Sequence, residues 1–355
     1  MKVFKSLPSS FLLFSIVLLI FIKTIFFIAI KNDFFSVNLG GGSDAEYYND
    51  YALGYIDVAV NTWPVMLRYL NNSGLYSRNI ISYLLFFISL FLIPILINRL
   101  ADIRFIENQK NYLYIYILCL IYPTIFFYTF DVYRDVFMVF SFLLGCLVVK
   151  RCLCSSSYIN FLLLFVFSLI VGLFLLGLRP YLGYAFLLAL FIWKIKFTKK
   201  RFIFLSVLYF SVLFFINYLG YIDFLTDYRS SFEEVGGGST IGLDFSNPIM
   251  FIPNFILSAL GQLFGLYITN PLAIILFLVE TVPFFFMLVY VVKNIKLADN
   301  FVRFLIIFFA IYGSVWLIGN DNLGTAVRLR IYNYLAIYIS FFYILRIKRL
   351  SSKKL

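Results

Sequence analysis

The sequence contains no histidine, and only 13% of its 355 residues are charged. The absence of histidine excludes histidine general bases, histidine metal ligands and Ser-His-Asp triads together. A soluble domain of this length would carry about a quarter charged residues, so the low charge content excludes an ordinary soluble fold. The four cysteines lie in apolar runs or beside a basic turn and suggest no disulfide framework.

Apolar sequence is abundant instead, at 63% of the chain. Runs of about twenty apolar residues recur, each long enough to cross a hydrocarbon core of about 30 Å. They do not alternate as the strands of a membrane barrel would. We therefore predict an all-α, polytopic integral membrane protein with one domain over residues 1–355. The net charge of +12 needs no nucleic-acid partner, because basic loops of membrane proteins face the cytoplasm and anionic lipid.

We expect about ten membrane-spanning helices, with both termini cytoplasmic. The first apolar run is longer than the core of a signal peptide and lacks a cleavage pattern, so we expect it to remain as a helix. Two long outer segments, 31–79 and 220–270, are expected to contain short interfacial helices; prolines interrupt the apolar stretch 248–270. The expected spans are 10–30, 80–98, 112–129, 136–149, 158–178, 181–193, 202–219, 271–292, 301–318 and 331–346.

The distribution of charge supports this orientation. The inner segments hold 13 lysines and 7 arginines, whereas the outer segments hold one lysine and seven arginines. Thirteen of the seventeen acids also lie in outer segments. The outer face is therefore acidic and poor in lysine, yet it keeps arginine. An excess of lysine and arginine on one side is the usual mark of the cytoplasmic face.

Arginine binds phosphate and carboxylate through two parallel hydrogen bonds and keeps its charge. Some outer arginines are expected to pair with outer acids, or to reach lipid headgroups. Others lie at tight helix ends, where neighbouring spans would hold them rigidly. The arginines taken as anion-binding candidates are Arg134, Arg179, Arg229, Arg328 and Arg330.

Several acids are candidate general bases. Asp44, Glu46 and Asp50 fall within seven residues of one another, and could act as a base, hold a metal ion or form a solvated loop. Asp135 adjoins Arg134, so the two could instead form a local ion pair. Glu280 lies in the middle of a span, where a carboxyl group is a functional candidate or a protonated acid bonded to a neighbouring helix. Candidate bases are Asp44, Glu46, Asp135 and Asp321.

Gly-Gly-Gly-Ser occurs at 40–43 and again at 236–239. Neither copy is followed by the Gly-Lys-Ser of a phosphate loop. Each is interpreted as a flexible loop that admits a large substrate, or as a backbone nest for a diphosphate.

Four stretches together resemble a known family. They are Tyr-Arg-Asp at 133–135, Leu-Arg-Pro-Tyr at 178–181, Gly-Gly-Gly-Ser-Thr-Ile-Gly-Leu-Asp at 236–244 and Asn-Leu-Gly-Thr-Ala-Val-Arg-Leu-Arg at 322–330. In these the sequence resembles Wzy-type O-antigen and capsular repeat-unit polymerases. The resemblance implies an enzyme of the bacterial inner membrane that acts at the periplasmic face on undecaprenyl-diphosphate-linked oligosaccharides. It implies no cofactor or metal, and a chain-length regulator as a partner. Lipopolysaccharide ligases are similar but use a periplasmic histidine, which this chain lacks.

In that reaction a sugar hydroxyl attacks an anomeric carbon and undecaprenyl diphosphate leaves. Fixed guanidinium groups would stabilise the charge that grows on the diphosphate. The resemblance implies this role for Arg328 and Arg330, with Arg134, Arg179 and Arg229 also binding diphosphate. We then expect Arg328→Ala or Arg330→Ala to abolish long polymer, and a change at Arg68 to matter less.

Two other functions remain open. Multi-span transferases that use polyprenyl-phosphate monosaccharides resemble this chain in the acidic motif at 43–48, and a metal requirement would favour them. A flippase for lipid-linked oligosaccharides would line a transmembrane path with charge. Here the charge collects at one face, with Lys23 and Glu280 as exceptions.

Overall fold

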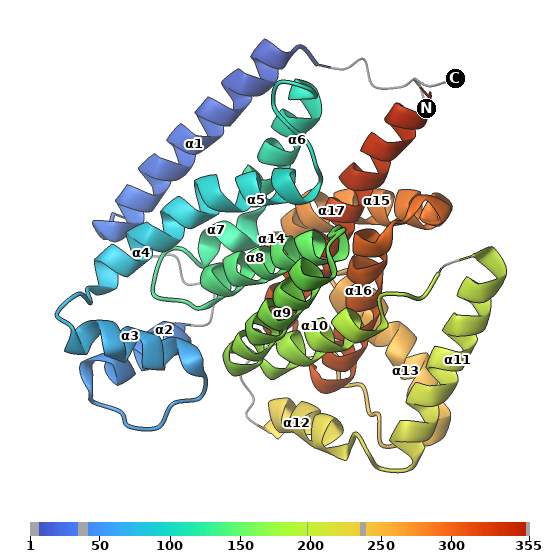
Figure 1. Cartoon of the computed structure of the whole chain (residues 1–355). Helices are drawn as coiled ribbons and strands as arrows, with labels where there is room; N and C mark the ends of the chain where they lie inside the picture. The colour runs from blue at the N-terminus through green and yellow to red at the C-terminus, as the bar shows by residue number, and fades with distance from the viewer. Residues whose placement is uncertain (1–6, 35–41, 197, 235–238, 353–355) are drawn as a thin grey trace. The chain divides into compact units, whose positions relative to one another are not determined.

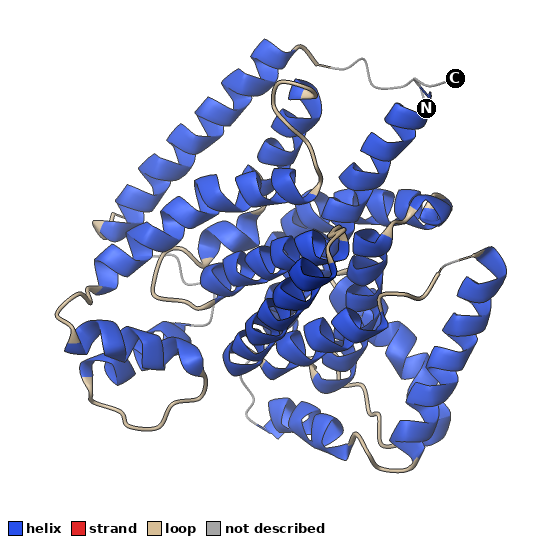
Figure 2. Cartoon of the chain, viewed as in Figure 1, coloured by secondary structure: helices blue, strands red, loops and turns tan. Residues whose placement is uncertain are grey.

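A computed structural model describes residues 7–34, 42–196, 198–234 and 239–352. All regular elements in these ranges are helical, and Thr240 and Asn322 form an isolated bridge (Figure 2). The predicted all-α class of a polytopic membrane protein is confirmed at this level. The helices form two compact units, residues 1–183 and 184–355, which are described separately below.

The predicted number of about ten spans is not confirmed. Within the described residues, six helices are long and apolar enough to cross a membrane. A seventh arises only if the helix Ile203–Tyr218 and the helix Asp223–Arg229, bent by 80°, are counted as one span. The six are Ser9–Lys31, Arg78–Leu100, Asp135–Leu153, Tyr158–Leu178, Pro271–Lys293 and Asn300–Gly319.

Three predicted spans differ from the observed helices for identifiable reasons. The span expected at 112–129 is two short helices, α6 (Gln109–Leu120) and α7 (Pro123–Phe127), because Pro123 lacks an amide hydrogen and forces Tyr122 out of helical geometry. The span expected at 181–193 is α10 (Pro180–Ile192), only 13 residues long. The span expected at 331–346 lies within α17 (Leu323–Ser352), a helix whose tyrosines and Asn333 lower its mean hydropathy.

The first unit is built on four long helical segments and a short hairpin (Figure 1). α2 and α3 form the hairpin and pack on each other. Between them the chain leaves α2 at Leu53 and re-enters a helix only at Thr62. The bounds are α1 Ser9–Lys31, α2 Gly42–Leu53, α3 Thr62–Asn72, α4 Arg78–Phe87 continuing through a π segment into α5 Ile93–Leu100, α8 Asp135–Leu153 and α9 Tyr158–Leu178.

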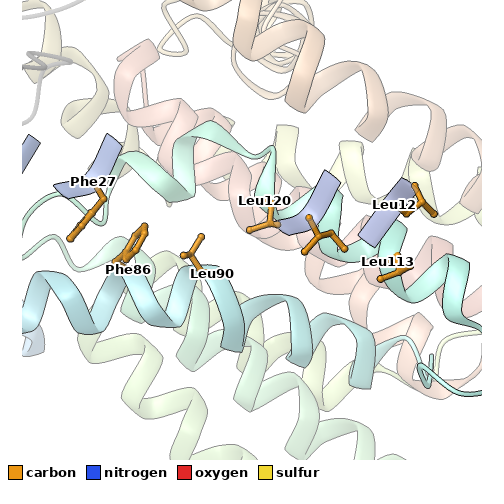
Figure 3. Close-up of a cluster of buried hydrophobic side chains, with 7 residues drawn as sticks. Leu12, Phe27, Phe86, Leu90, Leu113 and Leu120 are labelled. Atoms are coloured by element: carbon orange, nitrogen blue, oxygen red, sulfur yellow. The ribbon is translucent and has the colours of Figure 1, made fainter. Parts of the chain in front are cut away.

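A cluster of apolar side chains packs between α1, α4 and α6 (Figure 3), and Lys23 of α1 lies beside it with its ammonium 4.4 Å from the centre of the Phe126 ring. Phe27 of α1 stacks on Phe86 of α4, with ring centroids 4.2 Å apart and planes inclined by 13°. Leu12 and Leu113 close the other end of the same contact. Complete burial of each such side chain stabilises the packed state by about 1.5–3 kcal/mol where it is withdrawn from water.

The turn from α9 to α10 is unusually tight. Arg179 is extended, as a residue before proline usually is, and Pro180 then opens α10. A Cβ atom on Gly183 would lie 2.3 Å from the backbone of Leu176, so only glycine allows α10 to fold back this closely. This geometry fixes Arg179 at the end of α9.

The second unit is organised around α17. α17 packs against α15 and α16. Two π segments face it, η3 (Ala259–Leu263) and η4 (Phe277–Thr281), and tyrosine hydroxyls of α17 donate to their wide-turn carbonyls: Tyr334 to Leu263 O at 2.6 Å and Tyr338 to Glu280 O at 3.1 Å. The other bounds are α11 Lys199–Tyr218, α12 Asp223–Glu234, α13 Phe251–Ser258, α14 Pro271–Leu276, α15 Val282–Lys293 and α16 Asn300–Gly319.

The stretch 248–270 forms one helix rather than a pair. It begins with the turn Pro248–Met250 and runs through α13 and η3 to Leu263. Pro253 lies in its first turns, where a missing amide hydrogen is tolerated. Both long segments expected on the outer side thus contain short helices, as predicted.

Charged ends that were predicted to share a face lie together within each unit. Arg78 pairs with Asp131, both predicted outer. Lys150 caps the end of α5 through Arg99 O at 3.0 Å and Leu100 O at 2.9 Å, all predicted inner. In the second unit Lys348 bonds to Asn294 at 3.2 Å, again two predicted inner residues. In each of these contacts, residues predicted to lie on the same side of the membrane are bonded to each other.

Candidate functional site

Polar side chains from four elements of the first unit meet where α8 begins and α9 ends. Arg134 immediately precedes α8, Asp135 is its first residue, and Arg179 caps α9. α2 brings a carboxylate and a phenol, and the residue before α3 brings an amide. We call this set the arginine cluster: Asp44, Tyr48, Asn61, Arg134, Asp135 and Arg179.

The α2–α3 hairpin is fixed to these helix ends by two contacts. The indole Nε1 of Trp63 donates to Val132 O at 2.8 Å, and the ring packs on Phe137 with centroids 4.9 Å apart. A Cβ atom on Gly177 would lie 2.4 Å from Thr62 Oγ1, so α3 and α9 are in close contact there. These contacts hold α2 and Asn61 beside the two arginines.

Arg134 is only partly satisfied by protein groups. Arg134 Nη1 donates to Leu178 O at 3.2 Å, and Arg179 Nη2 lies 3.9 Å from Asp135 Oδ1, an ion pair too long for a hydrogen bond. Among the described residues, Arg134 Nε and Asp135 Oδ1 are buried without a hydrogen-bond partner. Buried polar groups of this kind are rare in proteins and indicate a missing ligand or water.

The arginine cluster holds equal numbers of arginines and aspartates. Burial lowers the pKa of Arg134 from its ordinary value, and the neighbouring Arg179 lowers it further, while Tyr48, Asp135 and Asp44 oppose the shift. The amino end of α8 adds the positive end of a helix dipole beside the same guanidinium. Arg134 thus lies between a second arginine and a helix amino terminus on one side and the carboxylates of Asp44 and Asp135 on the other.

Tyr48 and Asn61 add donors to the cluster. Burial raises the pKa of Tyr48 above its ordinary value, against the lowering effect of Arg134, so its hydroxyl stays protonated at neutral pH. Asn61 Oδ1 accepts from the backbone N–H of Trp63 at 2.9 Å as the cap of α3. This bond fixes the amide so that Nδ2 is turned away from the cap, and the amide is buried beside the Tyr48 hydroxyl, where its interaction lowers the pKa of Tyr48.

The acids of α2 divide between two directions. Asp44 is half-buried and shares a helix face with Tyr48, four residues on, toward Arg134. Glu46 is exposed and lies on the side of α2 that faces Arg78. Asp50 lies near Tyr76. Burial raises the pKa of Tyr76 to about 12. Of the four candidate bases, only Asp44 and Asp135 belong to the arginine cluster.

The predicted local pair of Arg134 with a neighbouring aspartate is not formed. Asp131 pairs instead with Arg78 through two hydrogen bonds, one of 2.7 Å from Arg78 Nε. Asp135 lies nearest to Arg179. Arg134 is therefore the less neutralised of the two arginines.

In the second unit Arg229 and Asp321 form a buried ion pair. Arg229 also donates to the backbone carbonyls of Leu243 at 2.8 Å and Asn320 at 2.6 Å, and it lies over the Phe245 ring. Asp321 accepts in addition from Gly242 N at 2.9 Å. These bonds fasten the stretch 239–246 to the end of α16, so both side chains serve the fold.

Arg330 and Glu280 form a second buried ion pair in this unit, at 2.9 Å. Glu280 is fully buried in η4, and Arg330 lies 5.5 Å from the centre of the Tyr334 ring. Arg328, two residues earlier on α17, is half-buried and points to a different face of the helix. Of the two arginines predicted to contact the leaving group, one is thus paired with an acid inside the protein.

No protein-family model, curated protein or solved structure matches the sequence. Its function has to be inferred from its own residues.

Other predicted features are placed as follows. Among the described residues, no three His, Cys, Asp or Glu side chains lie close enough to hold a metal ion. Most of the two Gly-Gly-Gly-Ser motifs lies outside the described residues, as Gly40, Gly41 and 236–238 do. The backbone of Ser239 is described and accepts from Leu323 N at 3.0 Å.

Sequence reasoning missed Asn61 as a site residue. Asn61-Thr62-Trp63-Pro64 carries a helix-start signal, a capping side chain followed by proline, so the cap could have been predicted. Its position beside Arg134 depends on α3 packing against α9, which no local pattern reveals.

Proposed function

We propose that the chain is a polysaccharide polymerase that joins oligosaccharide repeat units linked to undecaprenyl diphosphate. The supporting observation is the arginine cluster. It combines two guanidinium groups with two carboxylates at the end of membrane-spanning helices, and Arg134 Nε is buried there with no hydrogen-bond partner in the described residues. A diphosphate on a membrane lipid matches two arginines, and a glycosyl transfer needs a base nearby.

The chemistry divides among these groups. Asp44 or Asp135 accepts the proton of the acceptor hydroxyl, whose oxygen forms the new bond to the anomeric carbon of the donor sugar. The bond from that carbon to the diphosphate oxygen breaks, and undecaprenyl diphosphate leaves with the electron pair. Arg134 and Arg179 stabilise the charge on the leaving diphosphate. One well-placed donor of this kind contributes about 10²–10³ in rate.

The site would act at the outer face of a bacterial inner membrane, with both termini in the cytoplasm and a chain-length regulator as a partner. The 13 lysines and 7 arginines of the inner segments, against one lysine and seven arginines in the outer segments, support this orientation. Arg328 remains a candidate for the same diphosphate. Arg229 and Arg330 are weaker candidates, because buried acids already neutralise them.

The glycan made by a deletion strain tests the proposal. A polymerase deletion keeps single repeat units and loses long chains. Loss of one sugar from each unit would instead indicate a monosaccharide transferase, and loss of all surface glycan would indicate a flippase.

Complementation of that strain tests the site. Arg134→Ala and Arg179→Ala should each reduce long-chain glycan by about 10²–10³ in rate at normal protein level. Arg68→Ala is the matched control, because Arg68 forms an exposed pair with Asp57 at 3.0 Å in the same outer segment. Full-length chains from both cluster variants would exclude this site.

A further inference from the structure

The α2–α3 hairpin exposes a set of large apolar side chains although its backbone is well ordered. Tyr47 fixes the connecting loop, because its hydroxyl donates to Val58 O and accepts from Val60 N at 3.2 Å. Tyr55 N bonds to Asp50 O at 2.9 Å. The exposed residues are Leu53, Tyr55, Val58, Val60, Val65, Tyr69 and Leu75, each between 43% and 79% exposed.

α3 is apolar on two opposite faces. Trp63 and Leu67, four residues apart, are buried against the protein. Val65 and Tyr69, also four residues apart, form the opposite face and are 45% and 73% exposed. A helix in contact with water would carry polar residues on that second face. The second face is therefore built for an apolar environment.

The hairpin stands at the end of the membrane-spanning helices. Trp63 bonds to Val132 just before α8, and Thr62 touches Gly177 at the end of α9. α9 is a candidate span with an exposed apolar stripe that leads up to Gly177, formed by Ile159, Leu163, Val166, Ile170 and Leu173. Val65 follows Thr62 by one helical turn. The lipid-facing stripe of α9 thus continues onto the exposed face of α3.

Charge does not explain this surface. Residues 54–72 contain one acid and one base, Asp57 and Arg68, which pair with each other at 3.0 Å. The segment is therefore neutral and has no attraction for an anionic headgroup layer. Contact with hydrocarbon would cover its apolar side chains, with its tyrosines at the boundary where aromatic side chains gather.

We infer that the exposed edge of the α2–α3 hairpin is embedded in the lipid leaflet at this end of the spans, as a segment that lies in the membrane without crossing it. Burial of its apolar side chains in the leaflet would hold α2 at the bilayer surface. The inference is independent of the reaction that the chain catalyses, since it concerns only what covers this surface.

Fluorescence quenching in proteoliposomes tests the inference. A Cys154→Ser background removes the exposed cysteine among the four native ones. An environment-sensitive fluorophore is attached to Val58→Cys or, in a second variant, to Val60→Cys. Phe14→Cys on α1, 63% exposed, is the control for a lipid contact. Glu107→Cys, with a side chain 55% exposed in a polar turn, is the control for water.

Brominated phospholipid should quench the hairpin labels nearly as strongly as the Phe14 label, and iodide should leave them almost unquenched. Their emission should also be shifted to the blue relative to the Glu107 label. Quenching by iodide with no effect of bromolipid would overturn the inference, since the surface would then lie in water. Protection from both quenchers would overturn it too, because protein would cover the surface. Self-quenching on dense labelling would then identify a second copy as the cover.

Discussion

Arginines that look alike in the sequence have different surroundings in the structure. Arg229 and Arg330 each face a fully buried carboxylate, so their charge is neutralised inside the second unit. Arg134 faces another arginine, and burial together with that arginine lowers its pKa. The count of outer arginines therefore overstates the number available to a substrate, and Arg134 is the strongest of them.

Arg330→Ala should destabilise the protein whatever its reaction. The variant leaves the Glu280 carboxylate buried without its cation, which costs about 3–5 kcal/mol. The double variant Arg330→Met with Glu280→Gln should recover most of that loss. Thermal unfolding of the purified protein in detergent measures both.

This comparison separates two explanations for a loss of polymer. If Arg330→Ala unfolds at the temperature of the unaltered protein and yet makes no long chains, Arg330 acts on the substrate and the structural role assigned to it is wrong. If the double variant restores both stability and polymer, the pair serves the fold.

Asn61→Asp should weaken binding of a lipid diphosphate and keep the helix cap. Aspartate caps a helix as well as asparagine does, but it replaces the Nδ2 donor with a charged acceptor. Loss of a hydrogen bond to a charged group costs about 1.5–3 kcal/mol, or about ten- to a hundredfold in affinity. Binding of undecaprenyl diphosphate to protein in nanodiscs, titrated by intrinsic fluorescence, measures the change.

The matched control is Asn270→Asp. Asn270 caps α14 by accepting from Ala273 N at 2.9 Å, and it is exposed. Equal affinity for Asn61→Asp and Asn270→Asp would mean that Asn61 contributes only its cap. If Arg134→Ala also left the affinity for undecaprenyl diphosphate unchanged, the arginine cluster would not be the binding site.

At the scale of elements, the sequence predicted that a helix forms better than it predicted whether that helix is unbroken. The expected helix 158–178 matches α9 residue for residue, since no proline or charged residue interrupts that apolar run. The expected helix 112–129 is wrong because Pro123 breaks it. The π segments η3 and η4 could not be predicted, because α17 tyrosines bond to their carbonyls from more than fifty residues away.

The candidate site was predictable in composition but not in grouping. Arg134, Arg179, Asp44 and Asp135 were all selected from the sequence, and the structure brings these four together. Arg229 and Asp321, selected for the same reasons, are found bonded to each other. Which arginine pairs with an acid depends on how helices that are distant in sequence pack. Residue type and spacing do not predict that packing.

Gly177→Ala should disturb the site by displacing the helix α3, without changing any functional group. The added Cβ would lie 2.4 Å from Thr62 Oγ1 and push α3 away from α9, at a cost of about 1–3 kcal/mol. Asn61 and α2 would move with α3, so lipid-diphosphate affinity and polymer length should both fall. Adding Thr62→Ala should restore them, because Thr62 Cβ is 3.7 Å from the same point, an ordinary contact. No rescue by the second change would show that the hairpin is not positioned by this contact.

At the scale of the whole molecule, helix ends that were predicted to lie on the same side of the membrane are bonded to each other within each unit. The bonds from Lys150 to Arg99 O and from Lys348 to Asn294 join predicted inner residues. The bonds from Arg78 to Asp131 and from Arg229 to Asp321 join predicted outer residues. Within each unit, these contacts agree with the inner and outer faces predicted from charge, and the predicted orientation follows from that charge count.

That orientation predicts which cysteines an impermeant thiol reagent reaches. Cys154 is exposed beyond the carboxyl end of α8, in a segment predicted to be cytoplasmic. In spheroplasts it should stay unmodified by an impermeant maleimide until the membrane is permeabilised. Tyr221→Cys in a Cys154→Ser background, at a residue 73% exposed in the outer segment of the second unit, should be modified without permeabilisation. The opposite pattern at both positions would invert the whole chain, and would place the arginine cluster on the cytoplasmic side, where assembled lipid-linked repeat units would not reach it for polymerisation.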